Sequence, residues 1–420
     1  MRVWLVQRAE PTPHDDYGDR RLMRIGILAD ILQSKGHEVI WWTSAFDHIG
    51  KTKRYHHSKR VIVKENYFIH YLKSFGYKKN ISLSRYIDNK IITHQFKKDA
   101  RLEKEKPDII LTSVPSVELA QIVTHYANEN KIPVVLDIRD LYPDVLSELF
   151  PWPFRQLICI LTRPMRYKLI DICHKATAIS GITEDFVNWG LKHSGRDRNS
   201  KDVYFPMAYI KSEFSNEKKV RAISFWEKFG IKKNDKILNV LFLGTFTNSF
   251  EFEPIFLAAK ILQLQDAPVR FVICGIGKKE PEIKKACDDL NNCIFTGWIN
   301  ASQIKTILEL SDVGLAPYIH TKNFTENIPN KPAEYLSEDL LVVTSLKYGK
   351  LFDLLRSKEC GLSYGSDPIK LASLLKNLAK NAKYLKQFKK NARKTFVSQF
   401  DGKKVYVSMA NFLEEIAKKT

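Results

Sequence analysis

The stretch FTENIPNKPAEYLSEDLLVVTS, residues 324–345, separates two glutamates, Glu326 and Glu334, by seven residues that include two prolines and a lysine. Pro332 is tolerated in the first turn of a helix, because no hydrogen bond depends on its missing N–H there. The stretch therefore predicts a short helix over 331–340, with Glu334 in its first turn. The apolar run Leu-Leu-Val-Val that follows predicts a strand.

The start of this helix is suited to an anionic ligand. Lys331 lies beside the positive end of the helix dipole, which favours a diphosphate. The Glu334 carboxylate can accept two hydrogen bonds from the diol of a ribose, and Glu326 on the preceding loop reaches towards a sugar. The alternative is one carboxylate that caps the helix and another that faces solvent.

Outward from this stretch, short apolar strands alternate with helical periodicity along most of the chain. Such alternation predicts α/β domains with doubly wound parallel sheets of the Rossmann-like kind. We expect an N-terminal domain over 1–210, a C-terminal domain over 211–395 and a helix over 396–420 that packs back on the first domain. The boundary falls in the polar, irregular segment 205–220.

The chain is strongly basic, with a formal net charge of +20 over 420 residues. Its partner is therefore expected to be anionic. Residues 51–106 hold 16 Lys or Arg and 5 Asp or Glu, with aromatic residues between them. This segment predicts either a solvated insertion or a surface that meets an anionic membrane or a phosphate-bearing acceptor.

The sequence shows no sign of secretion or of a membrane span. The six cysteines form no CxxC pair, which favours free thiols in a reducing compartment. The N-terminal apolar run is too short for a signal peptide, and no run of about 18 apolar residues occurs. We expect a cytoplasmic protein that can contact the inner face of an anionic membrane. The stretch 151–168 mixes aromatic, aliphatic and basic residues, and predicts either a membrane-surface helix or an ordinary buried helix.

Residues just after each predicted strand are candidates for a site, because ligands of parallel sheets gather where the strands end. After the first strand, Gly18 precedes Arg20 and Arg21 at the start of a helix. Backbone N–H groups there can meet phosphate or acceptor oxygens. The alternative is a turn without a function.

Three acids and an arginine follow another predicted strand, in the stretch DIRDLYPDV at 137–145. Like charges held together raise one another's pKa, so such a cluster is typical of a functional site. We therefore predict site roles for Asp137, Arg139 and Asp140. The alternative is a structural cluster of ion pairs that Arg139 neutralises.

Two loops in the second half carry glycines after strands. Gly244 and Thr245 lie where the backbone can approach a phosphate closely. Gly275 and Gly277 begin a GxG pattern, but Glu280 stands where a dinucleotide fingerprint has its third glycine. The pattern therefore argues against a nicotinamide site.

Taken together, these stretches resemble the retaining GT-B glycosyltransferases of family 4, in particular the bacterial enzymes that build capsule, O-antigen and related envelope polysaccharides such as lipopolysaccharide. The family's E-x7-E pattern matches Glu326 and Glu334, and IPNKPAEYL is similar to its Pro-Asn-Lys…Glu-Tyr-Leu segment. GHEVIWWTSAFDH, RDLYPD and DVGLAPY also resemble segments of the family, in the family's order.

The resemblance implies that the C-terminal domain holds a nucleotide-sugar donor and the N-terminal domain an acceptor, with transfer under retention. The donor-binding residues that it implies are Glu334, Lys331, Asn330, Gly244 and Thr245. The catalytic residues are Glu326, near the reacting carbon of the sugar, and Asp140. On the acceptor side it implies Gly18, Arg20, Arg21, Asp137 and Arg139.

By analogy with the family, the donor is expected to be a UDP-linked N-acetylated hexose or deoxyhexose, and the acceptor a lipid-linked saccharide. No metal cofactor is expected, because such enzymes are usually metal-independent and no Asp-x-Asp pair lies near the donor stretches. The family's basic pair after the first strand of the C-terminal domain has no counterpart here, since the first base after Gly244 is Lys260.

Two other functions fit the sequence less well. A nucleotide-sugar 2-epimerase of the same fold has no need of the basic aromatic segment 51–106. A basic nucleic-acid-binding protein agrees with the net charge, but no nucleic-acid-binding module is recognisable, so nucleic acid is not expected as a partner.

Overall fold

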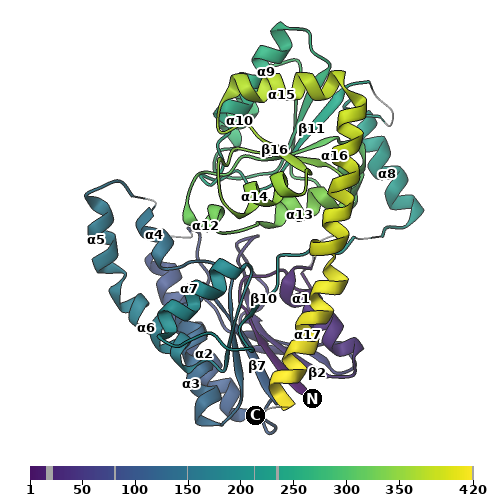
Figure 1. The fold of residues 1–420 in the computed structure, drawn as a ribbon. Helices are drawn as coiled ribbons and strands as arrows, with labels where there is room; N and C mark the ends of the chain where they lie inside the picture. Colours follow the sequence, from purple (N-terminus) through teal and green to yellow (C-terminus); the bar gives the residue numbers. More distant parts are fainter. Residues whose placement is uncertain (16–21, 80–81, 149, 212, 233–235, 419–420) are drawn as a thin grey trace. The chain divides into compact units, whose positions relative to one another are not determined.

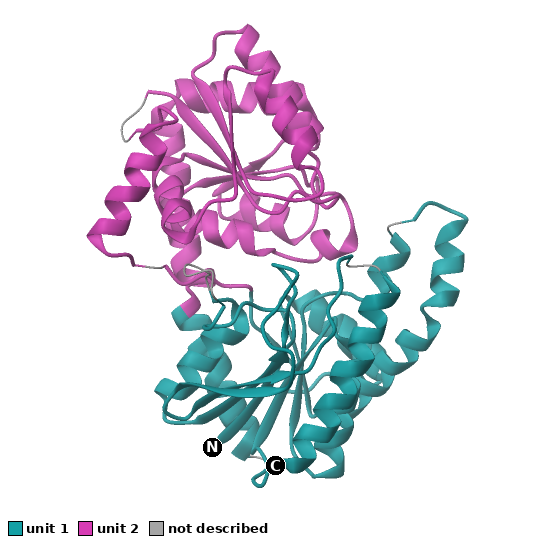
Figure 2. Cartoon of the chain, turned by 180° about the vertical axis from the view of Figure 1, so that it is seen from behind, with its two compact units in different colours: residues 1–206, 403–420 teal, residues 207–402 magenta. Residues whose placement is uncertain are grey.

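The structure is a computed structural model that describes residues 1–15, 22–79, 82–148, 150–211, 213–232 and 236–418. The chain divides into two compact units (Figure 2). Unit 1 comprises residues 1–206 and 403–420, and unit 2 comprises residues 207–402. The predicted boundaries were 210/211 and 395/396. The structure instead divides the chain at 206/207 and 402/403, so residues 207–210 and 396–402 both belong to unit 2.

Unit 1 is built on an eight-stranded sheet in the order β10-β9-β8-β7-β1-β2-β6-β5 (Figure 1). The strand pairs are parallel except for the edge pair β5–β6. The strands are β1 (Arg2–Val6), β2 (Glu38–Ser44), β5 (Lys59–Lys64), β6 (Tyr67–Leu72), β7 (Ile109–Val114), β8 (Val134–Ile138), β9 (Ala178–Gly181) and β10 (Val203–Tyr204). A small hairpin joins β3 (Phe46–Asp47) and β4 (Thr52–Lys53).

Helices lie against this sheet and extend beyond it. They are α1 (Arg24–Ser34), α2 (Leu83–Leu102), α3 (Val117–Glu129), α4 (Asp144–Glu148), α5 (Phe154–Leu161), α6 (Arg163–Lys175), α7 (Glu184–Ser194) and α17 (Gly402–Lys418). The C-terminal helix α17 is held by Glu414, whose carboxylate lies 2.7 Å from Lys35 Nζ and 2.7 Å from His37 Nε2. The terminal segment thus completes a unit that the first half of the chain builds.

The basic segment 51–106 is part of the sheet and not a separate insertion. Its strand β6 pairs with β2 and buries Tyr67 and Tyr71, and its helix α2 buries Ile92 and Phe96. The aromatic residues in this segment therefore belong partly to the core, while the basic side chains of β5 are exposed. The expectation of a solvated insertion is corrected for these elements.

Unit 2 has a six-stranded parallel sheet in the order β13-β12-β11-β14-β15-β16. The strands are β11 (Leu238–Leu243), β12 (Val269–Cys274), β13 (Cys293–Gly297), β14 (Val313–Ala316), β15 (Leu341–Thr344) and β16 (Gly361–Ser363). All six residues of β11 are buried, as expected for a central strand covered on both faces. Two parallel-sheet α/β domains are therefore confirmed.

The helices of unit 2 alternate with its strands. They are α8 (Asn216–Glu227), α9 (Glu253–Leu264), α10 (Glu280–Asp288), α11 (Ala301–Leu310), α12 (Lys322–Thr325), α13 (Asn330–Ser337), α14 (Lys350–Ser357), α15 (Pro368–Lys380), α16 (Ala382–Thr395) and the π-helix η1 (Phe396–Phe400). The segments 206–210 and 400–402 lie side by side, because Tyr209 N donates to Phe400 O at 3.0 Å and Gly402 N donates to Tyr209 O at 3.0 Å. None of the helices in the described ranges is long and apolar enough to cross a membrane.

Candidate active site

The strand ends of unit 2 approach one another through glycines. Gly244 follows β11 and Gly275 follows β12, with φ values of +154° and +148° that favour glycine. Gly244 N donates to Cys274 O at 3.0 Å, and Gly275 N donates to Gly297 O at 2.8 Å. A Cβ atom on Gly275 would lie 1.8 Å from Gly244 O, so the two loops are packed backbone to backbone.

Lys331 lies against the first of these loops, although 87 positions separate it from Gly244. A Cβ atom on Gly244 would lie 2.4 Å from Lys331 Cε and 2.6 Å from Lys331 Nζ. The ammonium group also lies 4.3 Å from the centre of the Phe250 ring. The structure thus brings together two of the predicted donor-binding residues. Two others, Thr245 and Asn330, are exposed on the same two segments.

Helix α13 starts at Asn330, one residue earlier than predicted, and Pro332 lies in its first turn. Glu334 is its fifth residue and so lies just beyond the first turn, which corrects the predicted position. Its side chain is largely buried, at 6% exposure. Burial in the second turn of α13 restricts the orientations that the Glu334 carboxylate can adopt.

Tyr335 fixes this helix on the sheet. Its hydroxyl accepts a hydrogen bond from Leu243 N at 3.1 Å, at the end of β11. Its ring occupies the space that a side chain on Gly314 would fill, since a Cβ atom there would lie 2.3 Å from the ring. Tyr335 therefore sets the position of Lys331 and Glu334 relative to the loop at Gly244. Sequence reasoning assigned it no role.

Glu326 lies at the end of α12, where its N–H donates to Lys322 O at 2.9 Å. Its side chain is half-buried. The short helix is held in place by Gly349, whose φ of +102° and lack of a side chain let Thr325 approach. A Cβ atom on Gly349 would lie 2.3 Å from Thr325 O. The segment that carries Glu326 is thus fixed against the start of α14.

Two buried polar atoms near this segment have no hydrogen-bond partner. They are the hydroxyl of Tyr318, which follows β14, and Oδ1 of Asn327. Burial raises the pKa of the Tyr318 hydroxyl well above its usual value, and the charge of Glu334 raises it further. Buried polar groups are normally satisfied, so both atoms are candidates for ligand contacts. Sequence reasoning missed them, although the strand-end rule applies to Tyr318.

Unit 2 also contains a cavity of about 670 Å³ beside β16, α14 and α16. Thr344, Tyr364 and Asn391 are among its lining residues. None of the predicted donor-binding residues lines it, so the cavity is separate from the segments at Gly244 and Lys331.

In unit 1, Asp137 is a core residue. Arg24 Nε and Nη2 donate to its two carboxylate oxygens at 2.9 Å each, and Ser180 Oγ donates to Oδ1 at 2.9 Å. Both side chains of the ion pair are wholly buried. Burial alone would raise the pKa of Asp137, but the Arg24 guanidinium outweighs burial and lowers that pKa. The prediction that Asp137 lines the acceptor side is corrected, because its carboxylate is engaged within the core.

Arg139 is held by an acid from another strand end. It forms an ion pair with Glu10, whose second carboxylate oxygen accepts from Ile25 N at 2.9 Å. Arg139 is therefore paired with an acid from outside its own stretch. Its side chain lies at the carboxyl edge of the sheet, just after β8.

Asp140 is half-buried, but one of its carboxylate oxygens is buried completely. Its Oδ1 has no hydrogen-bond partner. Burial raises the pKa of Asp140 to about 6, against a smaller lowering effect of Arg85. A carboxyl whose pKa lies near neutrality is typical of acid–base chemistry.

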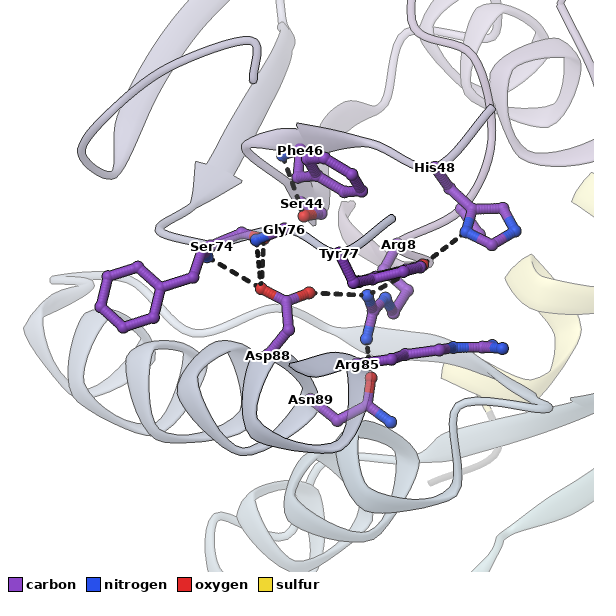
Figure 3. A network of polar contacts seen from close by, with 12 residues as sticks. Arg8, Ser44, Phe46, His48, Ser74, Gly76, Tyr77, Arg85, Asp88 and Asn89 are labelled. Carbon is purple, nitrogen blue, oxygen red and sulfur yellow. Dashed lines mark hydrogen bonds and ion pairs between the residues drawn. The ribbon is translucent and has the colours of Figure 1, made fainter. Parts of the chain in front are cut away.

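A polar network that sequence reasoning missed lies after β1, β2 and β6 of unit 1 (Figure 3). At its centre Asp88 is wholly buried and accepts from Ser74 Oγ at 2.6 Å, from Gly76 N at 3.0 Å and from Arg8 Nη2 at 2.9 Å. The Arg8 side chain is also buried and reaches the Tyr77 hydroxyl at 3.5 Å. This network fixes the orientation of the Tyr77 ring.

Three cations surround that ring. Lys51 Nζ lies 4.6 Å from its centre, and the guanidinium carbons of Arg85 and Arg8 lie 5.6 Å and 5.7 Å from it. His48 contacts the Tyr77 hydroxyl, and its pKa falls to about 4 because it is buried and the three cations repel its proton. These residues, Arg8, His48, Lys51, Tyr77 and Arg85, are named the Tyr77 cluster. Positive charge is thus concentrated at the carboxyl edge of the sheet, where an anion would be favoured.

Gly18, Arg20 and Arg21 lie outside the described residues. Among the residues that are described, no group of three His, Cys, Asp or Glu side chains is placed to hold a metal ion. Metal independence therefore stays a prediction.

Residues 224–395 match the family described as "Glycosyl transferases group 1". The match covers the greater part of unit 2, including the segments of Gly244, Lys331 and both glutamates. Comparison with curated protein sequences gives no match.

Several solved structures share the fold over the whole chain. Sucrose-phosphate synthase from Thermosynechococcus elongatus is 13% identical, with a TM-score of 0.73 and 100% of each chain covered. HepE from Anabaena, solved with UDP and glucose, is 12% identical, with a TM-score of 0.63 and 99% of this chain and 100% of that chain covered. WaaG, described as a glycosyltransferase involved in lipopolysaccharide biosynthesis, is 13% identical, with a TM-score of 0.61 and coverage of 98% and 99%.

These likenesses show that the chain has the GT-B fold, which confirms the predicted fold class. The family match over unit 2 and the GT-B fold together support a glycosyltransferase.

Proposed function

We propose that the protein transfers a hexose, with retention, from a nucleotide-diphosphate donor to a lipid-linked saccharide in the synthesis of a cell-envelope polysaccharide such as capsule or O-antigen. The observation that carries this proposal is the contact of Lys331 with the glycine loop at Gly244, beside a largely buried Glu334. A cation, a close backbone approach and a helix N-terminus together suit a diphosphate. The spacing of Glu326 and Glu334 supports the proposal that the protein is a family 4 enzyme.

Unit 2 is the proposed donor site. HepE has been solved with UDP and with UDP-glucose, and this supports a UDP-linked donor here. We assign the ribose diol to Glu334, the diphosphate to Lys331 and the N–H groups near Gly244, and the sugar to Glu326. Thr245 and Asn330 flank these groups. An N-acetylated hexose or deoxyhexose is the proposed sugar.

In the proposed reaction, the bond between the anomeric carbon and the diphosphate oxygen breaks while the acceptor oxygen bonds to the same face of that carbon. The proton of the acceptor hydroxyl passes to the departing phosphate oxygen. Negative charge grows on the leaving nucleoside diphosphate, and Lys331 stabilises it without a metal ion. Such a contact is worth about 2–4 kcal/mol of barrier.

The acceptor is assigned to unit 1. A lipid-linked saccharide carries phosphate next to its sugar, and the Tyr77 cluster offers Lys51 and Arg85 for it. Asp140 is within the electrostatic influence of Arg85, and we propose that it orients the acceptor hydroxyl. We therefore propose a cytoplasmic location, at the inner face of the membrane.

The two glutamates give a first test, because they are assigned different tasks. Glu334→Ala should weaken binding of the free nucleoside diphosphate by about tenfold or more, as expected when hydrogen bonds to a charged group are lost. Glu326→Ala should leave that affinity nearly unchanged and reduce the rate of sugar transfer. Titration calorimetry with the nucleotide and release of the nucleoside diphosphate from its sugar measure the two effects. Negligible effects of both substitutions would contradict the assignment.

Asp140→Asn gives a second test. Because the carboxyl has a pKa of about 6, wild-type activity should fall as the pH drops through 6 and the carboxylate becomes protonated. The variant should lose about 10²-fold in kcat and should lack this acidic limb. Its thermal stability at pH 8 should not fall for electrostatic reasons, since a pKa raised by burial means that the ionised carboxylate destabilises the fold there. An unchanged acidic limb in the variant would exclude Asp140 as its source.

A further inference from the structure

Helix α5 of unit 1 has not one buried residue along its eight positions. Its side chains Phe154, Leu157 and Leu161 are exposed by 60%, 53% and 64%, and Trp152 just before it is exposed by 77%. The expectation of an ordinary buried helix over 151–168 is therefore wrong for this part of the stretch. Contiguous apolar exposure of this kind marks an interaction surface.

The exposed apolar residues are concentrated in one short segment, which continues into α6. Between residues 150 and 170 the large hydrophobic side chains that are exposed are Phe150, Trp152, Phe154, Leu157, Ile160, Leu161, Tyr167 and Ile170. We name this segment, residues 150–170, the apolar segment. Figure 1 shows α5 standing away from the sheet of unit 1, beyond α6, and Figure 2 shows the same helices from behind.

All charged residues of the apolar segment are basic. It contains Arg155, Arg163, Arg166 and Lys168, and no Asp or Glu. Arg166 and Lys168 are tied to the body of unit 1 through Asp144 at 3.0 Å and Glu118 at 3.6 Å. Arg155 and Arg163 are exposed beside the apolar side chains.

Exposed apolar side chains next to basic ones favour an anionic membrane over a protein as the partner. A protein partner for such a surface would need an apolar groove lined with acids, whereas an anionic bilayer offers acyl chains beneath phosphate headgroups. Exposed Phe and Leu side chains can enter the acyl boundary, Trp152 is suited to the headgroup level, and arginines are attracted by anionic lipid. No helix of the described residues spans a membrane, so the contact would be with one face only.

We propose that the apolar segment docks unit 1 on an anionic phospholipid bilayer, with α5 lying between the headgroups and the acyl chains. The inference rests on exposure and charge alone and does not depend on the proposed sugar transfer. If both hold, docking would bring unit 1 to the membrane that carries a lipid-linked acceptor.

The test uses the full chain and two double variants. Sedimentation with vesicles of phosphatidylcholine, with and without phosphatidylglycerol, measures binding. The wild-type protein should bind the anionic vesicles, and less so at high salt. The double variant Leu157→Glu, Leu161→Glu should lower the partition constant for anionic vesicles by about tenfold or more. Two apolar side chains that would be buried in the bilayer are then replaced by negative charges, which the anionic lipid repels. The matched control, Leu257→Glu with Leu264→Glu, changes two exposed leucines of α9 in unit 2 and should bind as the wild type does.

Two results would overturn the proposal. One is equal vesicle binding by both double variants. The other is a wild-type protein that does not bind vesicles and is a dimer by light scattering, while the Leu157→Glu, Leu161→Glu variant is a monomer. The exposed apolar surface would then join two copies of the chain. Nucleotide titration of the same preparations separates this proposal from the proposed function: vesicle binding without nucleotide binding would leave docking intact and remove the donor site.

Discussion

Lys331→Met is expected to lower kcat for release of the nucleoside diphosphate by about 10²–10³-fold. The reason is that Lys331 is the cation that the structure places against the glycine loop after β11, with its side chain in the space next to Gly244. Methionine keeps the unbranched apolar stem but removes the charge. The leaving diphosphate would then be stabilised by backbone N–H groups and the helix dipole alone.

Lys383→Met is the matched control. Lys383 is the second residue of α16, as Lys331 is the second residue of α13, and it is exposed in the same unit. It should retain wild-type activity. If Lys331→Met were as active as this control, Lys331 would not be the diphosphate ligand, and the basic group that meets the phosphate would have to come from elsewhere in the chain.

Gly275→Ala is expected to reduce the stability of unit 2 by about 3 kcal/mol or more. The added Cβ atom would lie 1.8 Å from Gly244 O, which is a backbone atom and cannot swing aside, and the φ of +148° is unfavourable for alanine. The loops after β11 and β12 must then separate, so nucleotide affinity should fall as well. Thermal unfolding should show a loss of roughly 2–4 °C for each kcal/mol.

Gly230→Ala separates the two causes of this loss. Gly230 also has a positive φ, +69°, but nothing lies within 4 Å of the Cβ position. This substitution should destabilise unit 2 by about 1 kcal/mol from backbone conformation alone and should leave nucleotide binding unchanged. Equal losses in the two variants would show that the close approach of Gly275 to Gly244 is not what holds the loops.

Periodicity predicted the fold because strands of parallel sheets are short apolar runs. The strands β11 and β7 are buried throughout and are recognisable in the sequence as short, mainly apolar runs. The repeated alternation of strands and helices predicts two sheets. The basic segment 51–106 was harder to interpret, because β5 is an exposed edge strand whose basic residues hide its pairing with β6. Edge strands lack the continuous apolar pattern, so the charge of this segment dominated the prediction.

The donor side of the site could be predicted in part, since Lys331 and Gly244 lie in adjacent strand-end segments of one sheet. The role of Tyr335 could not be predicted. Its hydroxyl accepts a hydrogen bond from Leu243 N, and this contact between distant residues is known only from the folded structure. On the acceptor side the sequence could not tell a site acid from a structural acid. Asp137 and Asp140 are three positions apart. Asp137 is paired with Arg24 in the core, whereas Asp140 is half-buried and its buried Oδ1 has no hydrogen-bond partner.

The Tyr77 cluster escaped prediction for a similar reason. Arg8, Lys51 and Arg85 come from three distant segments, and each is an unremarkable base in a basic chain. The rule that ligands gather at strand ends applies to Arg8 and to Tyr77, which follow β1 and β6. What the sequence lacks is the pairing of β6 with β2, which brings these segments to one edge.

Calorimetric titration of the full chain with UDP, GDP and dTDP, with and without EDTA, measures whether unit 2 holds a nucleotide. We expect UDP to bind and the other two nucleotides not to bind. EDTA should leave the affinity for UDP unchanged, and Glu334→Ala should weaken it. Binding of none of the three nucleotides would contradict a nucleotide-sugar site at Lys331 and Glu334.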